Sequence, residues 1–298
     1  MRTSGGDVYE CKLKGSLRMR GSRSTNPAVV GDNVVFEPGT KETPGRISAI
    51  LPRNNYIARK ATKLSKASHV IAANIDQAFV IATLAQPRTS TGFIDRFLVT
   101  SEAYHIPGRI VFNKIDLYDP PLLETLENYT GIYNAAGYPC FKVSAKTGEG
   151  IDTLADALKG NVNLLAGHSG VGKSEIINSI RPGLNLKTRQ ISGYHEKGLH
   201  TTTFTEMFPL SFGGYIIDTP GIKEFGLFDF SRKEIPERFP EFRKYLHQCR
   251  FRNCTHLHEP GCAVKKALAE GEISSMRYEN YLSILNDDYW KATESDFS

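Results

Sequence analysis

A glycine-rich loop at residues 167–174 carries the side chains best suited to chemistry in this sequence. The loop matches the pattern G-x-x-x-x-G-K-S and consists of Gly167, His168, Ser169, Gly170, Val171, Gly172, Lys173 and Ser174. Glycines let the backbone wrap around a polyphosphate with its N–H groups pointing inward. The lysine can reach the β- and γ-phosphates, and the serine hydroxyl can bind Mg²⁺. An apolar run over 162–166 precedes the loop and a helix-compatible segment follows it, as a phosphate-binding loop requires.

Two motifs earlier in the chain could read a guanine base. The first is N-K-x-D, with Asn113, Lys114 and Asp116, and the second is S-A-K, with Ser144, Ala145 and Lys146. A carboxylate at position 116 can accept hydrogen bonds from the N1–H and the N2 amine of guanine, and backbone N–H groups of the second motif could bind guanine O6. Adenine has no donor at either place and would leave a desolvated carboxylate unpaired. We therefore expect GTP and GDP as ligands.

Two further motifs follow the phosphate loop. Asp218 and Gly221 belong to a D-x-x-G motif, in which the aspartate would hold the Mg²⁺ shell and the glycine N–H would sense the γ-phosphate. Thr202 lies in a run of three threonines, where a switch threonine should close on Mg²⁺. Mg²⁺ is therefore expected to bind together with GTP through Ser174, Thr202 and Asp218.

The order of these motifs is unusual. In ordinary GTPases the phosphate loop comes first and the base-reading motifs come last. Here both base-reading motifs precede the phosphate loop, so the domain is predicted to be circularly permuted. The D-x-x-G motif then stands at the end of the domain, directly connected to the C-terminal residues.

Cysteines and histidines near the C-terminus have the spacing of a metal site. The pattern C-x4-C-x-H-x5-C contains Cys249, Cys254, His256 and Cys262. Three thiolates and an imidazole can complete a tetrahedral shell around one zinc ion per chain, and four protein ligands make such a site structural. His247 and His258 are alternative histidine ligands. The sequence contains 5 cysteines, and an odd number favours metal binding in a reducing compartment over a disulfide framework.

The elements that must position these motifs form three predicted domains. Residues 1–66 show short strands separated by Gly, Pro and Asn, which predicts a small β-barrel of the OB type. Residues 67–230 alternate apolar strands with amphipathic helices, which is typical of a parallel α/β sheet with ligands at the carboxyl ends of its strands. Residues 231–298 are predicted to be mainly helical around the zinc site. The predicted strands cover 8–13, 29–36, 45–51, 56–58, 77–84, 109–112, 140–143, 162–166, 204–210 and 214–217, and the predicted helices cover 93–104, 122–135, 151–158 and 173–180.

Positive charge is concentrated in the first predicted domain. Residues 1–66 carry 13 Lys and Arg against 5 Asp and Glu, whereas residues 67–230 carry 13 against 16. This bias favours contact with a polyanion, and a small barrel with basic loops is a common RNA-binding device. The chain has no run of about 18 apolar residues and no apolar stretch behind its N-terminal charge. We expect a cytoplasmic protein that binds no membrane and, by default, is a monomer.

The basic N-terminal domain, the permuted GTPase motifs and the cysteine-rich segment together resemble the RsgA (YjeQ/YloQ) family of GTPases. The resemblance extends to Gly31-Asp32-x-Val34 and to Gly198-x-His200-Thr201-Thr202-Thr203. It implies a late-acting assembly factor that binds the 30S ribosomal subunit and its 16S rRNA and checks the decoding region. A member of the family hydrolyses GTP faster on the subunit and then leaves it.

The residue that positions the attacking water is not evident from the motifs. Ile222 follows the D-x-x-G motif at the place where Ras-like enzymes carry a water-orienting glutamine, so we expect slow intrinsic hydrolysis. His200 is the candidate for this role, with hydrogen bonding or packing in the switch loop as the alternative. Lys173 and Thr202 are the other expected catalytic residues.

The function that these features favour is GTP hydrolysis that times binding to the small subunit. A GTP/GDP-dependent RNA-binding module with negligible hydrolysis is the first alternative. An enzyme that uses a zinc-activated water is a second alternative, and a shell of four protein ligands argues against it.

Overall fold

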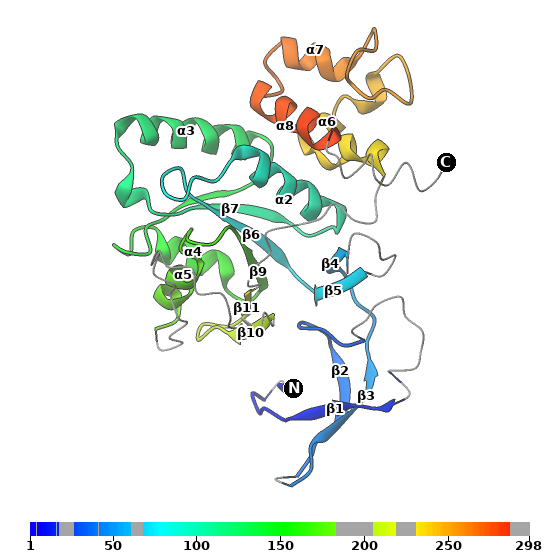
Figure 1. The fold of residues 1–298 in the computed structure, drawn as a ribbon, viewed down its shortest axis with the longest axis vertical. Helices are drawn as coiled ribbons and strands as arrows, with labels where there is room; N and C mark the ends of the chain where they lie inside the picture. The colour runs from blue at the N-terminus through cyan, green and yellow to red at the C-terminus, as the bar shows by residue number, and fades with distance from the viewer. Residues whose placement is uncertain are drawn as a thin grey trace, which may run out of the picture.

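The structure is a computed structural model, and it describes residues 1–3, 5–15, 17, 27–40, 42–60, 68–182, 205–218 and 231–286. These residues form short N-terminal strands, a central sheet with helices on both faces, and a C-terminal group of helices (Figure 1). Within the described ranges, none of the helices combines the length and the apolar character needed to cross a lipid bilayer.

Short strands make up the N-terminal unit. β1 (Cys11–Leu13), β3 (Gly45–Ile50) and β2 (Val34–Glu37) form a sheet in that spatial order, with β1 parallel and β2 antiparallel to β3. β4 (Tyr56–Lys60) and β5 (Ser68–Ala73) form an antiparallel ribbon. Each strand predicted before residue 60 overlaps an observed strand, whereas closure into an OB-type barrel stays a prediction.

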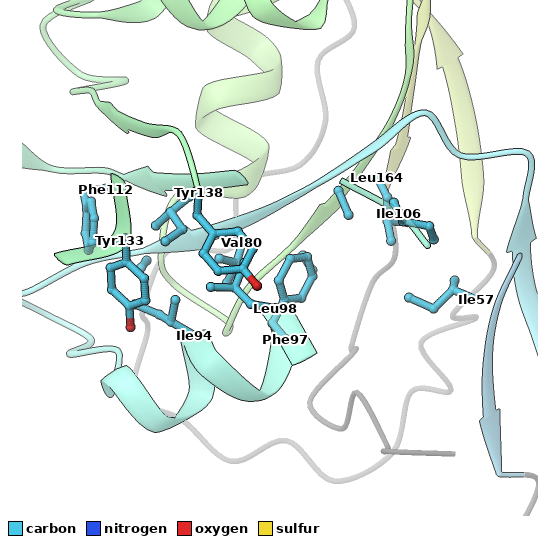
Figure 2. Packing of buried hydrophobic residues seen from close by; sticks show 14 of the residues in the cluster. Ile57, Val80, Ile94, Phe97, Leu98, Ile106, Phe112, Tyr133, Tyr138 and Leu164 are labelled. Atoms are coloured by element: carbon cyan, nitrogen blue, oxygen red, sulfur yellow. The ribbon is translucent and has the colours of Figure 1, made fainter. Parts of the chain in front are cut away.

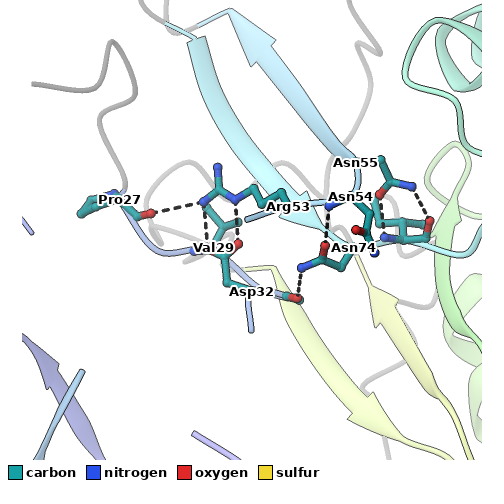
Figure 3. A network of polar contacts seen from close by, with 9 residues as sticks. Pro27, Val29, Asp32, Arg53, Asn54, Asn55 and Asn74 are labelled. Atoms are coloured by element: carbon teal, nitrogen blue, oxygen red, sulfur yellow. Dashed lines mark hydrogen bonds and ion pairs between the residues drawn. The ribbon is translucent and has the colours of Figure 1, made fainter. Parts of the chain in front are cut away.

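Strand β5 has no counterpart in the prediction and follows the predicted domain boundary at residue 66. The predicted strand that follows it begins at Gln77, and the polar residues Asn74 and Asp76 separate the two in the sequence. The break comes at Asn74, which has a φ of 54° and whose side chain bonds the backbone of Gly31 and Asn54, at 2.9 Å each (Figure 3). Pairing with β4 joins β5 to the N-terminal unit, and the boundary between residues 66 and 67 stays a prediction.

The Gly-Asp pair at 31–32 ties the loops of this unit together (Figure 3). The guanidinium of Arg53 donates to both carboxylate oxygens of Asp32, at 2.6 and 2.8 Å, and this hydrogen bonding raises the pKa of Arg53 above its ordinary value. Gly31 has a φ of 87°, and a Cβ there would lie 2.0 Å from the carbonyl oxygen of Ala73. Glycine is therefore required where this loop approaches β5.

The central sheet has six strands in the order β10-β11-β9-β6-β7-β8. They are β6 (Gln77–Ala82), β7 (Gly108–Phe112), β8 (Cys140–Lys142), β9 (Val162–Ala166), β10 (Glu206–Pro209) and β11 (Tyr215–Asp218). All neighbours are parallel except β10 and β11. The six strands predicted in this region are confirmed and differ only at their ends. The antiparallel edge strand was not expected, and it arises because a tight turn, closed by a hydrogen bond from Leu210 N–H to the carbonyl of Gly214, joins β10 to β11.

Helices cover both faces of this sheet, with α2 (Thr91–Ala103) and α3 (Pro120–Ala135) on one face and α4 (Ile151–Leu158) and α5 (Lys173–Ile180) on the other (Figure 1). Alternate residues of β6 feed two separate cores. Val80 packs with Ile94 and Leu98 of α2 (Figure 2), whereas Phe79 and Ile81 pack on the α4 and α5 side. Burial on both faces explains why the strands are almost continuously apolar.

The four predicted helices are confirmed. α4 and α5 cover the predicted residues, while α2 and α3 begin two residues earlier than predicted. Ser90 caps α2 by accepting a hydrogen bond from the N–H of Phe93, and Asp119 caps α3 in the same way from Leu122. Capping by Ser and Asp fixes these earlier starts.

The C-terminal unit is helical, as predicted. Its elements are η2 (Arg232–Arg238), α6 (Pro240–Arg243), η3 (Leu246–Gln248), α7 (Ala263–Ala269) and α8 (Ser275–Leu285). They enclose an apolar core of their own, to which Val99 of α2 also belongs. α8 packs directly against α2, so this unit sits on the outer face of that helix (Figure 1).

Candidate functional site

The predicted nucleotide motifs meet at one edge of the central sheet. β7, β8, β9 and β11 are parallel to one another through β6, so their carboxyl ends lie at the same edge. Asn113 follows β7, Ser144 lies just after β8, the loop at 167–174 follows β9, and Asp218 is the last residue of β11. Parallel pairing alone therefore brings together motifs that are far apart in the chain.

Asn113 and Lys114 join the base-reading motif to the phosphate loop. The Asn113 side chain is buried, and its amide donates to the carbonyl of Val171 at 2.9 Å and accepts from the N–H of Ala145 at 3.2 Å. The Lys114 ammonium donates to the carbonyl of Gly170 at 2.7 Å. Asn113 and Lys114 thus fix the positions of the N-K-x-D motif, the S-A-K motif and the phosphate loop relative to one another.

Asp116 is held by the second base-reading motif. The hydroxyl of Ser144 donates to the Asp116 carboxylate at 2.6 Å and accepts from the N–H of Thr147 at 3.2 Å. Ser144 is fully buried, whereas Asp116, in the short turn η1 (Ile115–Leu117), is exposed. The hydrogen bond from Ser144 therefore orients a carboxylate that is still accessible to a ligand.

The phosphate loop is shaped by close backbone approach. Gly172 has a φ of 93°, and a Cβ there would lie 2.2 Å from the side-chain nitrogen of Asn113. The Lys173 ammonium donates to the carbonyls of Gly167 at 2.6 Å and His168 at 3.1 Å, so it points into its own loop. Only glycine satisfies both the backbone angle and the space at position 172.

Lys173, Ser174 and Asp218 lie on the phosphate side of the site. Burial lowers the pKa of the Lys173 ammonium, and the negative charge of Asp218 opposes this shift. Lys173 and Ser174 open α5, so a bound anion would also meet the positive end of that helix. A cation, a hydroxyl and a carboxylate are the groups that a Mg²⁺-bound polyphosphate needs.

Three residues support the site without being predicted. The backbone carbonyl of Gln86 accepts from Lys114 at 2.8 Å, and the Tyr118 hydroxyl donates to the carbonyl of Asn113 at 2.8 Å. The ring of Phe93 lies on the imidazole of His168, with centroids 3.8 Å apart. These three residues belong to no recognisable sequence motif. Of the three, only Phe93 lies next to a feature visible in the sequence, which is the N-cap of α2 at Ser90.

Several predicted site residues lie outside the described part of the chain. They are His200, Thr202 and Gly221, together with Ile222. Their predicted roles in sensing the γ-phosphate, closing on Mg²⁺ and positioning water remain predictions.

The cysteine-rich segment forms a compact cluster of metal-ligating atoms. Ligand atoms of Cys249, Cys254, His256 and Cys262 all lie within 4.8 Å of one another. His256 Nδ1 is 3.6 Å from the Cys249 sulfur and 3.3 Å from the Cys262 sulfur. A tetrahedral zinc shell separates nitrogen and sulfur ligands by about 3.5 Å, so the cluster has zinc-compatible dimensions.

His256, rather than His247 or His258, joins this cluster. Its left-handed backbone, with φ of 59°, turns the side chain into the core, where it is only 2% exposed. The Glu259 carboxylate fixes this turn by accepting from the N–H and hydroxyl of Thr255 and from the N–H of Leu257. Burial lowers the pKa of His256, which favours the neutral imidazole that binds metals.

Comparison with known proteins gives consistent matches over nearly the whole chain. A family model described as RsgA GTPase matches residues 50–228. The chain is 54% identical over 287 residues to the small ribosomal subunit biogenesis GTPase RsgA of Bacteroides fragilis, covering 96% of this chain and 92% of that protein. The protein of the same name from Christiangramia forsetii is 50% identical over 290 residues, covering 97% and 92%.

Two solved structures resemble the chain throughout. YjeQ from Thermotoga maritima matches with a TM-score of 0.77 at 38% identity, covering 95% of this chain and 90% of that one. YloQ, described as a circularly permuted GTPase, matches with a TM-score of 0.72 at 30% identity, covering 97% of this chain and 88% of that one.

Proposed function

Because this chain belongs to the RsgA family of circularly permuted GTPases, we propose that it hydrolyses GTP as a biogenesis factor of the small (30S) ribosomal subunit. The observation that carries the proposal is the bridge from Asn113 and Lys114 to the phosphate loop. This bridge makes a single site from a guanine-reading motif and a polyphosphate-binding motif. Base specificity and phosphate chemistry then act on the same ligand.

In this site Asp116 reads guanine through the N1–H and N2 donors, and the S-A-K turn lies beside it, with Ser144 buried and Lys146 exposed. The phosphate loop and Lys173 hold the polyphosphate. Ser174 and Asp218 hold Mg²⁺, which supplies charge neutralisation at the phosphates when bound. Thr202 completes the Mg²⁺ shell, Gly221 senses the γ-phosphate, and His200 positions water.

The N-terminal unit is the proposed contact for 16S rRNA. Lys12, Lys14 and Arg46 are exposed and line one hollow of about 500 Å³ beside the paired strands β1 and β3. Such a group of cations suits phosphates of an RNA backbone. A protein that acts on the small subunit works where that subunit is assembled, which is the bacterial cytoplasm.

The Cys249, Cys254, His256 and Cys262 cluster is proposed to bind one structural zinc ion. Its ligand spacing and the neutral state favoured for His256 support this assignment. Four protein ligands would leave no position for a reacting water, so zinc would stabilise the C-terminal unit and take no part in hydrolysis.

We predict that small subunits strongly stimulate GTP hydrolysis and that Lys173→Ala lowers the stimulated rate by about 100-fold or more, because the variant lacks the ammonium that stabilises transferred charge. Phosphate release is measured without ribosomal subunits, with small subunits and with large subunits. The exposed Lys159 is the matched control, and Lys159→Ala should keep the wild-type rate. Equal rates in all three mixtures would contradict the small subunit as the partner, and negligible rates in all three would favour the RNA-binding module without significant hydrolysis.

We predict that Lys12→Ala/Arg46→Ala weakens binding to small subunits and reduces the magnitude of the slope of log affinity against log salt by about one to two. The reason is that a variant with fewer phosphate contacts releases fewer counterions from the RNA when it binds. The double variant Lys142→Ala/Lys159→Ala removes the same charge from the central domain and should leave the slope unchanged. Binding is measured by co-sedimentation at several salt concentrations. An unchanged slope in the first variant would show that this hollow is not the RNA contact.

We predict that the purified protein holds about one zinc ion per chain and that Cys254→Ser removes it. Zinc is measured by mass spectrometry and stability by thermal unfolding. Cys140→Ser, in strand β8, should retain both metal and stability. Chelation that abolished hydrolysis but left the C-terminal unit folded would contradict a structural role and favour a zinc-activated water.

A further inference from the structure

The first turn of α2 lies against the phosphate loop. The ring of Phe93, on this turn, lies against the imidazole of His168, with centroids 3.8 Å apart and the planes tilted by 33°. The His168 carbonyl accepts from the Lys173 ammonium. The segment before α2 is also attached to the loop, because the Lys114 ammonium donates both to Gln86 and to Gly170. A change in how Lys173 is held therefore reaches α2 through direct contacts.

The outer face of α2 holds the C-terminal unit. Asp95, Val99 and Glu102 recur at helical spacing, so they share one face. Asp95 is fully buried and accepts from Arg277 of α8 at 2.6 Å. Val99 lies in the C-terminal core, and Glu102 pairs with Arg243. Successive turns of one helix thus contact both the phosphate loop and the C-terminal unit.

The ion cluster at this interface resists rearrangement. Arg277 is 1% exposed and also donates to both carboxylate oxygens of Glu241, at 2.6 and 3.1 Å. Asn280 of α8 donates to the second oxygen of Asp95 at 2.7 Å. Separating these groups would leave buried charges unpaired, which is strongly unfavourable. Movement of α2 must therefore either carry α8 with it or loosen its packing.

We infer that α2 couples the phosphate loop to the C-terminal unit, so that occupation of the loop by a nucleoside diphosphate tightens the packing of α8 on α2. A bound diphosphate draws the Lys173 ammonium away from the His168 carbonyl and fixes the loop beneath Phe93. This coupling rests on the proposed nucleotide site, but it needs neither the γ-phosphate nor the predicted switch residues. It is a second connection between the two units, separate from the chain segment that follows Asp218.

Hydrogen exchange of residues 275–285, with and without saturating GDP, tests this coupling. In the wild-type protein GDP should slow exchange in α8 by at least about fivefold. Phe93→Leu keeps an apolar side chain but removes the ring that contacts His168, so GDP should no longer slow exchange in α8. Phe93→Tyr restores the ring and should restore the effect. Phe36→Leu removes a comparable ring contact, with Tyr9, from the N-terminal unit and should behave as wild type.

GDP affinity, measured on the same samples, distinguishes failure of the coupling from failure of the proposed nucleotide site. Binding of GDP without any slowing of exchange in α8, or slowing that persists in Phe93→Leu, would overturn the coupling and leave the nucleotide site intact. Faster exchange with GDP would also overturn it, because the inferred direction is opposite. Failure of the wild-type protein to bind GDP would overturn both the coupling and the proposed function.

Discussion

The carboxyl ends of parallel strands must lie at one edge of their sheet, and the candidate site depends on this constraint. The edge is the same in whatever order the strands follow one another along the chain. β7 and β8 can therefore supply base-reading groups before β9 supplies the phosphate loop. Asn113 converts this proximity into one site, because its buried amide bonds both the phosphate loop and the S-A-K motif. Permutation changes the connections of the domain while the positions of the functional groups are kept.

The permuted order also changes what the domain is attached to. Its last strand, β11, now leads towards the C-terminal unit, and that unit packs on α2 at the opposite end of the domain's sequence. Arg277, Asp95 and Glu241 fix this packing with buried charge. The Asp95 and Glu241 carboxylates raise the pKa of Arg277 against the opposing effect of burial, so the guanidinium stays charged. Removing one partner of such a pair typically costs about 3–5 kcal/mol, because it leaves the other charge buried without compensation.

Much of this arrangement was predictable because local patterns decide it. Strands buried on both faces are almost continuously apolar. A glycine-rich loop marks the end of β9, and the capping residues Ser90 and Asp119 mark the starts of α2 and α3. What could not be predicted depends on contacts between distant segments. The pairing of β5 with β4 joins residues beyond the predicted boundary to the N-terminal unit, and the choice of His256 depends on a backbone turn held by Glu259. Gln86 contributes through its carbonyl, which every residue has, and the Phe93 ring meets His168 only after folding.

Substitution of Asp116 tests whether residues 113–116 bind the base of the same nucleotide whose phosphates the later phosphate loop holds. Asp116→Asn replaces an acceptor with a group that can donate to the C2 carbonyl of xanthine. Affinities for GDP and xanthosine diphosphate are measured by competition, with the exposed Asp152→Asn as the matched control. Asp116→Asn should lower GDP affinity by about 100-fold or more and make xanthosine diphosphate the preferred ligand. Undiminished affinity of Asp116→Asn for GDP would contradict base reading by Asp116.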